Sequence, residues 1–305
     1  MLLKGPENTA SFAAQMSFTK SARVAWEHIL RKCWRADSLR VLLPAYIGET
    51  DREGSGVFDP VRELECEYRF YPVSNRLVPD TDTIARTVST ENIDVLLAIH
   101  YFGFVQSDMP ALRSLCDKHN IVLVEDCAHV CLLHGNFPGA TGDYGFFSLH
   151  KFLPTDTGGA LRANDRSAIA IPADDRCDPD VLEQLSRTNL SAAAEQRRRN
   201  YAFLFNQLST VSGLTLMYQL DESTVPHDFP TLIHNNQREA LYFHLQSQQM
   251  PTIALYYRLV SEIDPKAYPV SFEVSDSILN LPVHQDTSRE DLEALAAEIR
   301  RFLGA

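Results

Sequence analysis

One lysine stands where its chemistry could matter. Lys151 lies three residues after Ser148, behind an aromatic pair, and is followed by the double glycine Gly158 and Gly159. A lysine amine is useful when it forms a Schiff base with an aldehyde, above all that of pyridoxal phosphate. That cofactor also needs an acid on its ring nitrogen, donors on its phosphate and a flat contact on its ring. The alternative interpretation is a solvated lysine at a turn, because lysine side chains are seldom buried.

Residues elsewhere in the chain could meet these three needs. Asp126 ends the apolar run 121–126, and its carboxylate could keep the ring nitrogen protonated. Ser148 could reach the phosphate, and Ser21 could add its hydroxyl, the neighbouring backbone amides and the positive end of the helix that follows it. His129 could hydrogen-bond the ring hydroxyl or lie against the ring. Each has a plainer alternative, since an aspartate can cap a turn and a histidine can be structural.

Five further residues are weaker candidates. Lys20 shares the turn of Ser21 and could add to the phosphate contact. Tyr46 could stack on the cofactor ring, although an aromatic residue there is more often part of the core. His100, Tyr256 and Tyr257 could reach the substrate, and packing explains them as well.

Apolar runs and a capped helix predict the frame that positions these side chains. The runs 94–100 and 121–126 are typical of parallel strands covered on both faces. The segment 106–120 between them opens with the capping residues Ser107 and Asp108 and carries one apolar face. Strand, helix and strand in this order predict a right-handed crossover, and ligands in such sheets bind at the carboxyl ends of the strands.

The remaining pattern completes an α/β chain with a small α+β part. We predict a helix from about residue 22 and strands at 41–46, 65–71, 213–220 and 228–235. Helices are expected within 179–208, at 236–248 and at the end of the chain, where Thr287 and Glu290 form a capping-box pattern. The run Arg197, Arg198, Arg199 is interpreted as a solvated helix face. We divide the chain into a large domain, 1–195, and a small domain, 196–305.

Composition narrows the classes of function. The chain has 305 residues, 45% of them hydrophobic, which is enough for a large core. Acidic residues outnumber basic ones 40 to 28, and the net charge of -12 argues against nucleic acid or an anionic membrane as the main partner. The six cysteines show no zinc-ligand spacing, so we expect reduced core thiols and no metal. No stretch approaches the roughly 20 apolar residues of a membrane span, and we expect a cytoplasmic protein.

Taken together, the motifs resemble those of a known family. "VEDCAH" and, some twenty residues later, "GDYGFFSLHKFLPTDTGGAL" are similar to the fold-type I, pyridoxal-phosphate-dependent enzymes, and most closely to the DegT-type sugar aminotransferases. Members carry a strand that ends in Asp, a Gln or His three residues later, an aromatic and serine run, the Schiff-base lysine and a double glycine. The resemblance covers most of the chain and is strongest over 94–162.

The resemblance implies a fold, a cofactor and an activity. It implies a three-layer, mostly parallel sheet that binds pyridoxal phosphate, with Lys151 as the Schiff-base lysine, Asp126 and His129 on the ring, and Ser21 with Ser148 on the phosphate. The implied reaction transfers an amino group from an amino acid, expected to be glutamate, to a keto-sugar, expected to be nucleotide-linked, in amino-sugar or surface-glycan biosynthesis. Because fold-type I sites form at a dimer interface, a homodimer is expected.

Departures from the family keep two alternatives open. The family usually places its serine five residues before the lysine, whereas "SLHK" matches the pattern of cysteine desulfurases. A desulfurase needs a reactive cysteine beyond the lysine, and Cys177 is the only cysteine there. The segment after the lysine is also shorter than in the family, which keeps open a non-catalytic or regulatory relative that retains the fold.

Overall fold

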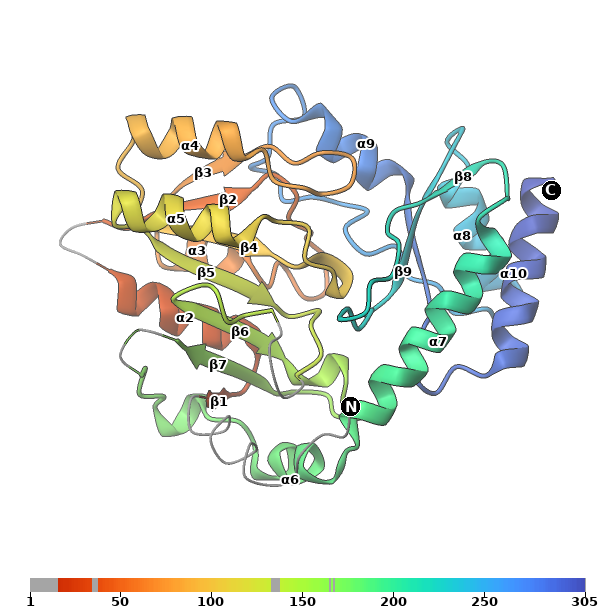
Figure 1. The fold of residues 1–305 in the computed structure, drawn as a ribbon, viewed down its shortest axis with the longest axis horizontal. Coiled ribbons are helices and arrows are strands. Elements are labelled where there is room, and N and C mark those ends of the chain that lie inside the picture. Colours follow the sequence, from red (N-terminus) through yellow and green to blue (C-terminus); the bar gives the residue numbers. More distant parts are fainter. Residues whose placement is uncertain (1–15, 35–37, 133–137, 165, 167, 305) are drawn as a thin grey trace.

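A seven-stranded sheet forms the larger part of the molecule (Figure 1). The computed structural model describes residues 16–34, 38–132, 138–164, 166 and 168–304. Across the sheet the strands follow the order β1 (Met16–Thr19), β7 (Gly159–Ala163), β6 (Tyr144–Ser148), β5 (Val122–Cys127), β4 (Val95–Ile99), β2 (Arg40–Pro44) and β3 (Glu67–Tyr71). Neighbours from β3 to β6 pair in parallel, and only the pairs made by β7 are antiparallel. The expected mostly parallel sheet is thereby confirmed.

The central strands form where the apolar runs predict them. Every residue of β4 and β5 is buried, as expected for strands with helices on both faces. The predicted strands 41–46, 65–71, 94–100 and 121–126 correspond to β2, β3, β4 and β5.

Helices cover both faces of this sheet (Figure 1). The helices α4 (Thr81–Thr90) and α5 (Met109–His119) lie on the near face in this view, and α2 (Ala22–Cys33) and α3 (Phe58–Glu63) lie behind it. The crossover helix begins where the sequence indicates, because the Asp108 carboxylate accepts a hydrogen bond from the Ala111 amide at 3.0 Å. Three helical turns lie in the connections, η1 (Tyr101–Gly103), η2 (Leu149–Lys151) and η3 (Ala173–Asp175).

Two helices connect the large sheet to the rest of the molecule. The segment 179–208 forms α6 (Pro179–Arg187) and α7 (Leu190–Leu208). Asn189 separates them by capping α7, its side chain accepting a hydrogen bond from the Ala192 amide at 3.0 Å. The expected boundary between residues 195 and 196 lies inside α7, and the division into two domains stays a prediction.

A second, smaller sheet lies beyond α7. It contains β10 (Ile278–Leu281), β9 (Phe229–Ile233) and β8 (Leu214–Leu216) in that order, all antiparallel. The helices α8 (Arg238–Ser247), α9 (Pro269–Ser277) and α10 (Arg289–Leu303) accompany it, and α10 packs against α7 and α8. The predicted cap of the last helix is one residue too early. Ser288 and Asp291 exchange the two capping hydrogen bonds, because Ser288 has the extended backbone of a cap and Asp291 can replace Glu in the third helical position.

The arginine run is a second correction. Arg197 is 1% exposed, so the interpretation of the run as a solvated face is wrong for this residue. It lies on the side of α7 that also buries Ala194, Tyr201 and Leu204, as a helical spacing of three to four residues requires. Arg199 lies on the outer side and is exposed.

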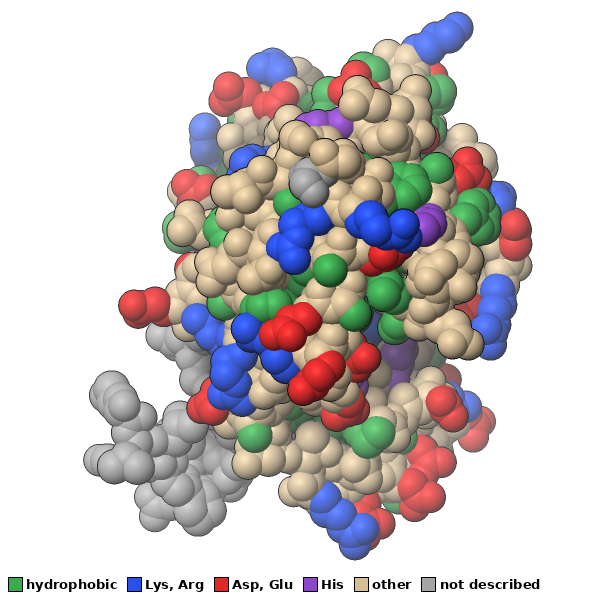
Figure 2. Space-filling model, turned by 90° about the vertical axis from the view of Figure 1, so that its right-hand side faces the viewer, with side chains coloured by type: hydrophobic (Ala, Val, Ile, Leu, Met, Phe, Trp, Pro, Cys, Tyr) green, Lys and Arg blue, Asp and Glu red, His purple; other side chains and the backbone are tan. Residues whose placement is uncertain are grey.

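The structure also locates the cysteines and the surface charges. All six cysteines are buried. On the face shown in Figure 2, acidic and basic side chains are interspersed. Of the helices that the structure describes, none has the length and apolar character needed to cross a membrane.

Candidate active site

A cavity of about 1180 Å³ opens at the carboxyl ends of the parallel strands. Its walls come from four parts of the chain: the start of α2, the loop 47–57 after β2, the ends of β5 and β6, and the region from α8 to residue 257. This is the edge at which ligands bind in parallel α/β sheets. Of the predicted site residues, seven line it: Ser21, Asp126, His129, Ser148, Lys151, Tyr256 and Tyr257.

Lys151 reaches the cavity because the chain turns sharply after β6. The Leu149 amide donates to the Gly158 carbonyl at 2.9 Å, which brings the double glycine back beside the turn. Gly158 has a φ of 115°, which favours glycine. A Cβ on Gly159 would lie far inside van der Waals contact with the backbone of Ser21. Glycine therefore lets β7 approach the start of α2 and places the lysine and that helix end at one pocket.

Asp126 is an acid in an apolar setting. It is 4% exposed and accepts a hydrogen bond from the Ala128 amide at 2.8 Å. Burial raises the pKa of Asp126 to about 6, although that hydrogen bond and the nearby His100 and Lys151 act in the opposite direction. A cationic partner would relieve the cost of burying this carboxylate, so the residue fits a protonated ring nitrogen.

His129 lines the cavity with a neutral ring. Its ring stacks on that of His227 with centroids 4.6 Å apart and an interplanar angle of 8°. Burial and the nearby His227 and Lys151 hold the pKa of His129 well below its usual value. Its Nδ1 accepts from the Phe102 amide at 3.2 Å, so the proton of the neutral ring is on Nε2.

The start of α2 forms the predicted phosphate end. Ser21 is the N-cap, and its Oγ accepts from the Val24 amide at 3.3 Å. Ser148 lines the same cavity, and its Oγ lies 3.2 Å from Nδ1 of His150. Lys20 does not belong to the lining residues: its side chain is exposed, while its backbone carbonyl accepts from the Gly158 amide at 2.7 Å.

Two predicted residues lie behind the wall. Tyr46 is fully buried and packs on Tyr256 with ring centroids 5.3 Å apart. His100 is 1% exposed, and its Nε2 lies 2.7 Å from the Glu125 carboxylate. Glu125 also accepts three backbone hydrogen bonds from residues 139–142. The structure thus places neither Tyr46 nor His100 at the cavity surface, and the His100–Glu125 pair instead fixes a connection after β5.

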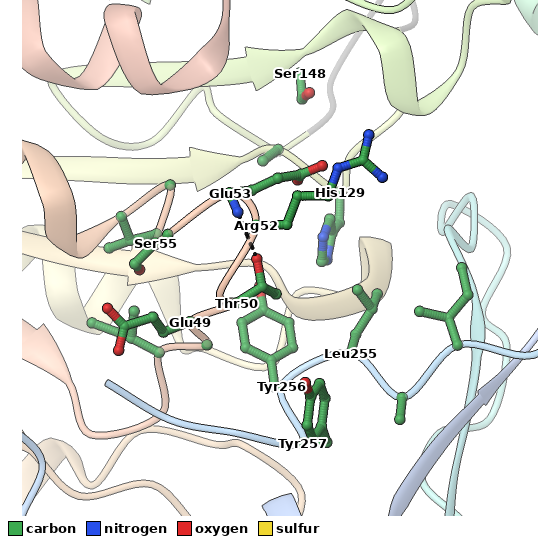
Figure 3. Close-up of a pocket in the computed structure, with 18 of the residues that line it drawn as sticks. Glu49, Thr50, Arg52, Glu53, Ser55, His129, Ser148, Leu255, Tyr256 and Tyr257 are labelled. Carbon is green, nitrogen blue, oxygen red and sulfur yellow. Dashed lines mark hydrogen bonds between the residues drawn. The ribbon is translucent and has the colours of Figure 1, made fainter. Parts of the chain in front are cut away.

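The two tyrosines of 252–257 differ in position. Tyr256 is half-buried and its ring is part of the wall beside His129, whereas Tyr257 is 46% exposed at the rim (Figure 3). Gly48 faces the first of these rings so closely that a Cβ there would meet it at 2.6 Å. Glycine at this position lets the loop after β2 pack on Tyr256.

Sequence reasoning missed several residues of the lining. Arg52 and Glu53 lie on the loop 47–57 and project toward the region between Ser148 and His129 (Figure 3). The loop is tied to α2, since Arg23 donates to the Glu53 carbonyl and pairs with Asp59. His227, which is absent from the described lining but stacks on the lining residue His129, was missed as well, because only the folded chain brings the two together.

Comparison with known proteins agrees with this picture. The sheet order and the pocket define the aspartate-aminotransferase-like fold of type I. The chain belongs to the DegT/DnrJ/EryC1/StrS aminotransferase family, which matches residues 61–171 and 181–300.

The curated relatives are moderately similar. A dTDP-3-amino-3,6-dideoxy-alpha-D-galactopyranose transaminase from Aneurinibacillus thermoaerophilus is 24% identical over 251 residues, covering 70% of this chain and 66% of the relative. An L-glutamine:2-deoxy-scyllo-inosose aminotransferase from Streptoalloteichus tenebrarius is 33% identical over 135 residues, covering 42% and 30%. The chain thus spans less than two thirds of the length of these two relatives.

Solved structures share the fold over nearly the whole chain. The aminotransferase TlmJ from Streptoalloteichus hindustanus superposes with a TM-score of 0.81 at 22% identity, covering 99% of this chain and 92% of the other. The PLP form of Spr1654 from Streptococcus pneumoniae gives the same TM-score and coverage at 17% identity. At these identities the similarity shows the fold.

Proposed function

We propose that this protein is a pyridoxal-phosphate-dependent aminotransferase that transfers an amino group from an amino acid to a keto-sugar. The observation that carries the proposal is that Lys151 and Asp126 line one cavity in a chain of this family. The cavity exceeds the roughly 300–1,000 Å³ that holds one drug-sized ligand, which leaves room for a cofactor and a second molecule.

The donor set fits the cofactor. Lys151 would bond to its aldehyde carbon, and Asp126 would hold its ring nitrogen protonated. His129 would contact the cofactor ring or its hydroxyl, because it lines the cavity and its neutral ring carries a donor on Nε2. Ser21, Ser148 and the free amides at the start of α2 would hold the phosphate. When bound, pyridoxal phosphate draws electron density from the carbon that carries the amino group.

The chain's own residues then manage the proton. The Lys151 amine, when free, would be the base beside the reacting carbon, taking a proton from one atom and returning it to another. Because burial disfavours the negative charge of Asp126, a cationic partner would stabilise it, so the residue favours the protonated ring.

The relatives indicate the class of acceptor. Their names describe transaminases of dTDP- and UDP-linked amino sugars, a GDP-perosamine synthase and glutamine-dependent inosose aminotransferases. We infer a nucleotide-linked keto-sugar as acceptor for this chain and glutamate as donor, with amino-sugar or surface-glycan biosynthesis as the setting. Glutamine is the second donor to test.

The alternative of cysteine desulfuration finds no support in the site. It needs an accessible cysteine beyond the lysine, and Cys177 is 6% exposed with a pKa that burial raises. Cys177 is absent from the described lining of the cavity.

The test is the visible absorption spectrum of the purified protein with pyridoxal phosphate, beside Lys151→Ala. We expect a band that depends on Lys151 and bleaches when glutamate or glutamine is added. A band that bleaches only with cysteine, with release of sulfide, would favour desulfuration. Absence of the band from the unaltered protein would overturn the proposal in favour of a non-catalytic relative.

We propose a homodimer as well, because fold-type I sites are completed at a subunit interface. The molar mass in solution, measured by light scattering with the cofactor bound, would be twice that of the 34.4 kDa chain. A monomeric mass would contradict this.

A further inference from the structure

A buried arginine lies directly beneath the candidate lysine. The Arg197 guanidinium donates from Nη2 to the Lys151 carbonyl at 3.0 Å and from Nη1 to the His227 carbonyl at 3.0 Å. Its Nε donates to Oε1 of Gln285 at 2.8 Å. The face of the group lies 4.5 Å from the ring centroid of Phe152. One planar cation thus contacts four residues from three segments that are far apart in the sequence.

Stabilisation of the fold does not by itself explain a buried arginine at this position. In the described part of the chain, Arg197 makes no ion pair, and Asp228 and Asp286 act on it only from a distance. Burial lowers the pKa of Arg197, yet an arginine remains charged in proteins. A buried cation without a paired anion normally costs free energy, and apolar residues of similar volume often replace buried charges without loss. What the guanidinium provides is a fixed set of planar donors.

One of the residues it holds, Lys151, lines the cavity, and another, His227, stacks on the lining residue His129. Lys151 and Phe152 are adjacent in the chain. The edge of the guanidinium contacts the Lys151 carbonyl and its face contacts the Phe152 ring, so both contacts hold the same turn. The His227 carbonyl is the third attachment, and the His227 ring stacks on His129 at the cavity wall. The Phe152 ring also meets the His227 ring edge-on, with centroids 5.9 Å apart. Arg197 therefore joins the lysine turn to the histidine stack.

We propose that Arg197 is a positioning residue that fixes the Lys151 turn relative to the stacked His129 and His227 rings. It acts on the lysine through the main chain and does not itself touch the ligands, since it is absent from the described lining of the cavity. The inference rests on the proposed role of Lys151 as the residue that bonds to pyridoxal phosphate.

The experiment compares how readily individual lysines react. The cofactor-free protein is incubated with subsaturating pyridoxal phosphate and then with borohydride, which reduces the bond between the lysine nitrogen and the aldehyde carbon to a stable amine. Peptide mass spectrometry gives the ratio of labelled Lys151 to labelled Lys118, an exposed lysine on α5. Arg197→Lys keeps the charge and loses the planar donors, Arg197→Met loses both, and Arg199→Met is the control from the exposed side of the same helix.

We expect the ratio to fall at least fivefold in Arg197→Lys and at least tenfold in Arg197→Met, and to stay within twofold in Arg199→Met. Circular dichroism and the unfolding temperature establish that each variant is folded during labelling. An unchanged ratio in folded Arg197→Lys and Arg197→Met would overturn the inference, because a merely stabilising role would leave Lys151 as reactive as before.

Two further outcomes are distinguishable. If both Arg197 variants fail to fold, Gln285→Ala replaces them, since it removes one acceptor and leaves the charge; a threefold fall supports the inference and an unchanged ratio overturns it. If the unaltered protein labels Lys151 no faster than Lys118, the proposed function itself fails, and the inference fails with it.

Discussion

The titration of one residue, Asp126, should make the stability of the folded protein depend on pH. Its pKa is about 6 in the folded protein and about 4 in an unfolded chain. Because the folded state binds the proton more tightly, the contribution is fully present below pH 4 and is lost as pH rises through 6. A shift of about two units corresponds to about 3 kcal/mol. We therefore compare the free energy of unfolding in urea for the cofactor-free protein and for Asp126→Asn. Between pH 4 and pH 8, the value for Asp126→Asn should rise by about that much relative to the value for the unaltered chain. Parallel pH profiles would contradict the assignment.

The same substitution has a separate effect on chemistry. Asparagine cannot hold the ring nitrogen of the cofactor protonated, so we expect amino transfer from glutamate to slow by about 100-fold or more, within the range of acid–base contributions. Rapid mixing followed by the loss of the visible band measures this step. Lys151 should remain attached to the cofactor in Asp126→Asn, which is the internal control. A rate within threefold of the unaltered protein would exclude the proposed partnership.

Local sequence predicted some site residues and could not predict others. Lys151 and Asp126, which line the cavity, were predicted because Asp126 lies near the end of an apolar strand and Lys151 follows the next strand, each at a fixed spacing from recognisable neighbours. Arg197 was misread because its partners, at 151, 227 and 285, leave no local pattern, and a triple arginine resembles a solvated helix face. His227 was missed for the same reason, since its stacking on His129 joins segments 98 positions apart.

At the scale of elements, the contact between β7 and α2 decides where the phosphate end lies. A methyl group on Gly159 would collide with the backbone of Ser21, which cannot move aside as a flexible side chain could. We expect Gly159→Ala to weaken pyridoxal phosphate binding at least tenfold in a spectroscopic titration and to lower the unfolding temperature. Gly56→Ala is the matched control for stability, because nothing lies within 4 Å of a Cβ there. Equal unfolding temperatures in the two variants would refute the close packing.

The cap of the last helix offers a test that is independent of the active site. Ser288 accepts the Asp291 amide at 3.1 Å, whereas Thr287, one residue earlier, is not the capping residue. Ser288→Ala should lower the free energy of unfolding by about 1 kcal/mol, while Thr287→Ala should leave it nearly unchanged. Denaturant titration of both variants measures the difference. A larger loss of stability in Thr287→Ala than in Ser288→Ala would identify Thr287 as the capping residue, as the sequence pattern predicts.

Strands were predictable where burial alone specifies them. The strands β4 and β5 are recognised in the sequence as continuous apolar runs, because both faces of these strands are covered. The strands β1 and β7 were not foreseen, since β7 begins with Gly159 and Ala160 and neither strand alternates clearly. Their pairing depends on the double glycine, which lets the start of α2 pack closely against β7. This packing is a tertiary contact.

At the scale of the whole molecule, the cavity is lined by segments that belong to the large sheet and by segments that lie beside the small sheet. Asp126 and Lys151 come from the large sheet, whereas the segment 252–257 comes from the chain between α8 and α9, beside the small sheet. The Ile253 amide bonds to the Asn280 carbonyl of β10 at 3.1 Å, so this wall is attached to the small sheet. A ligand that contacts both walls stabilises their closed arrangement. Hydrogen exchange of the 252–257 amides should therefore slow at least fivefold when pyridoxal phosphate and a keto-sugar nucleotide are both bound, and less with the cofactor alone. Protection confined to the large sheet would mean that the acceptor does not reach the 252–257 wall.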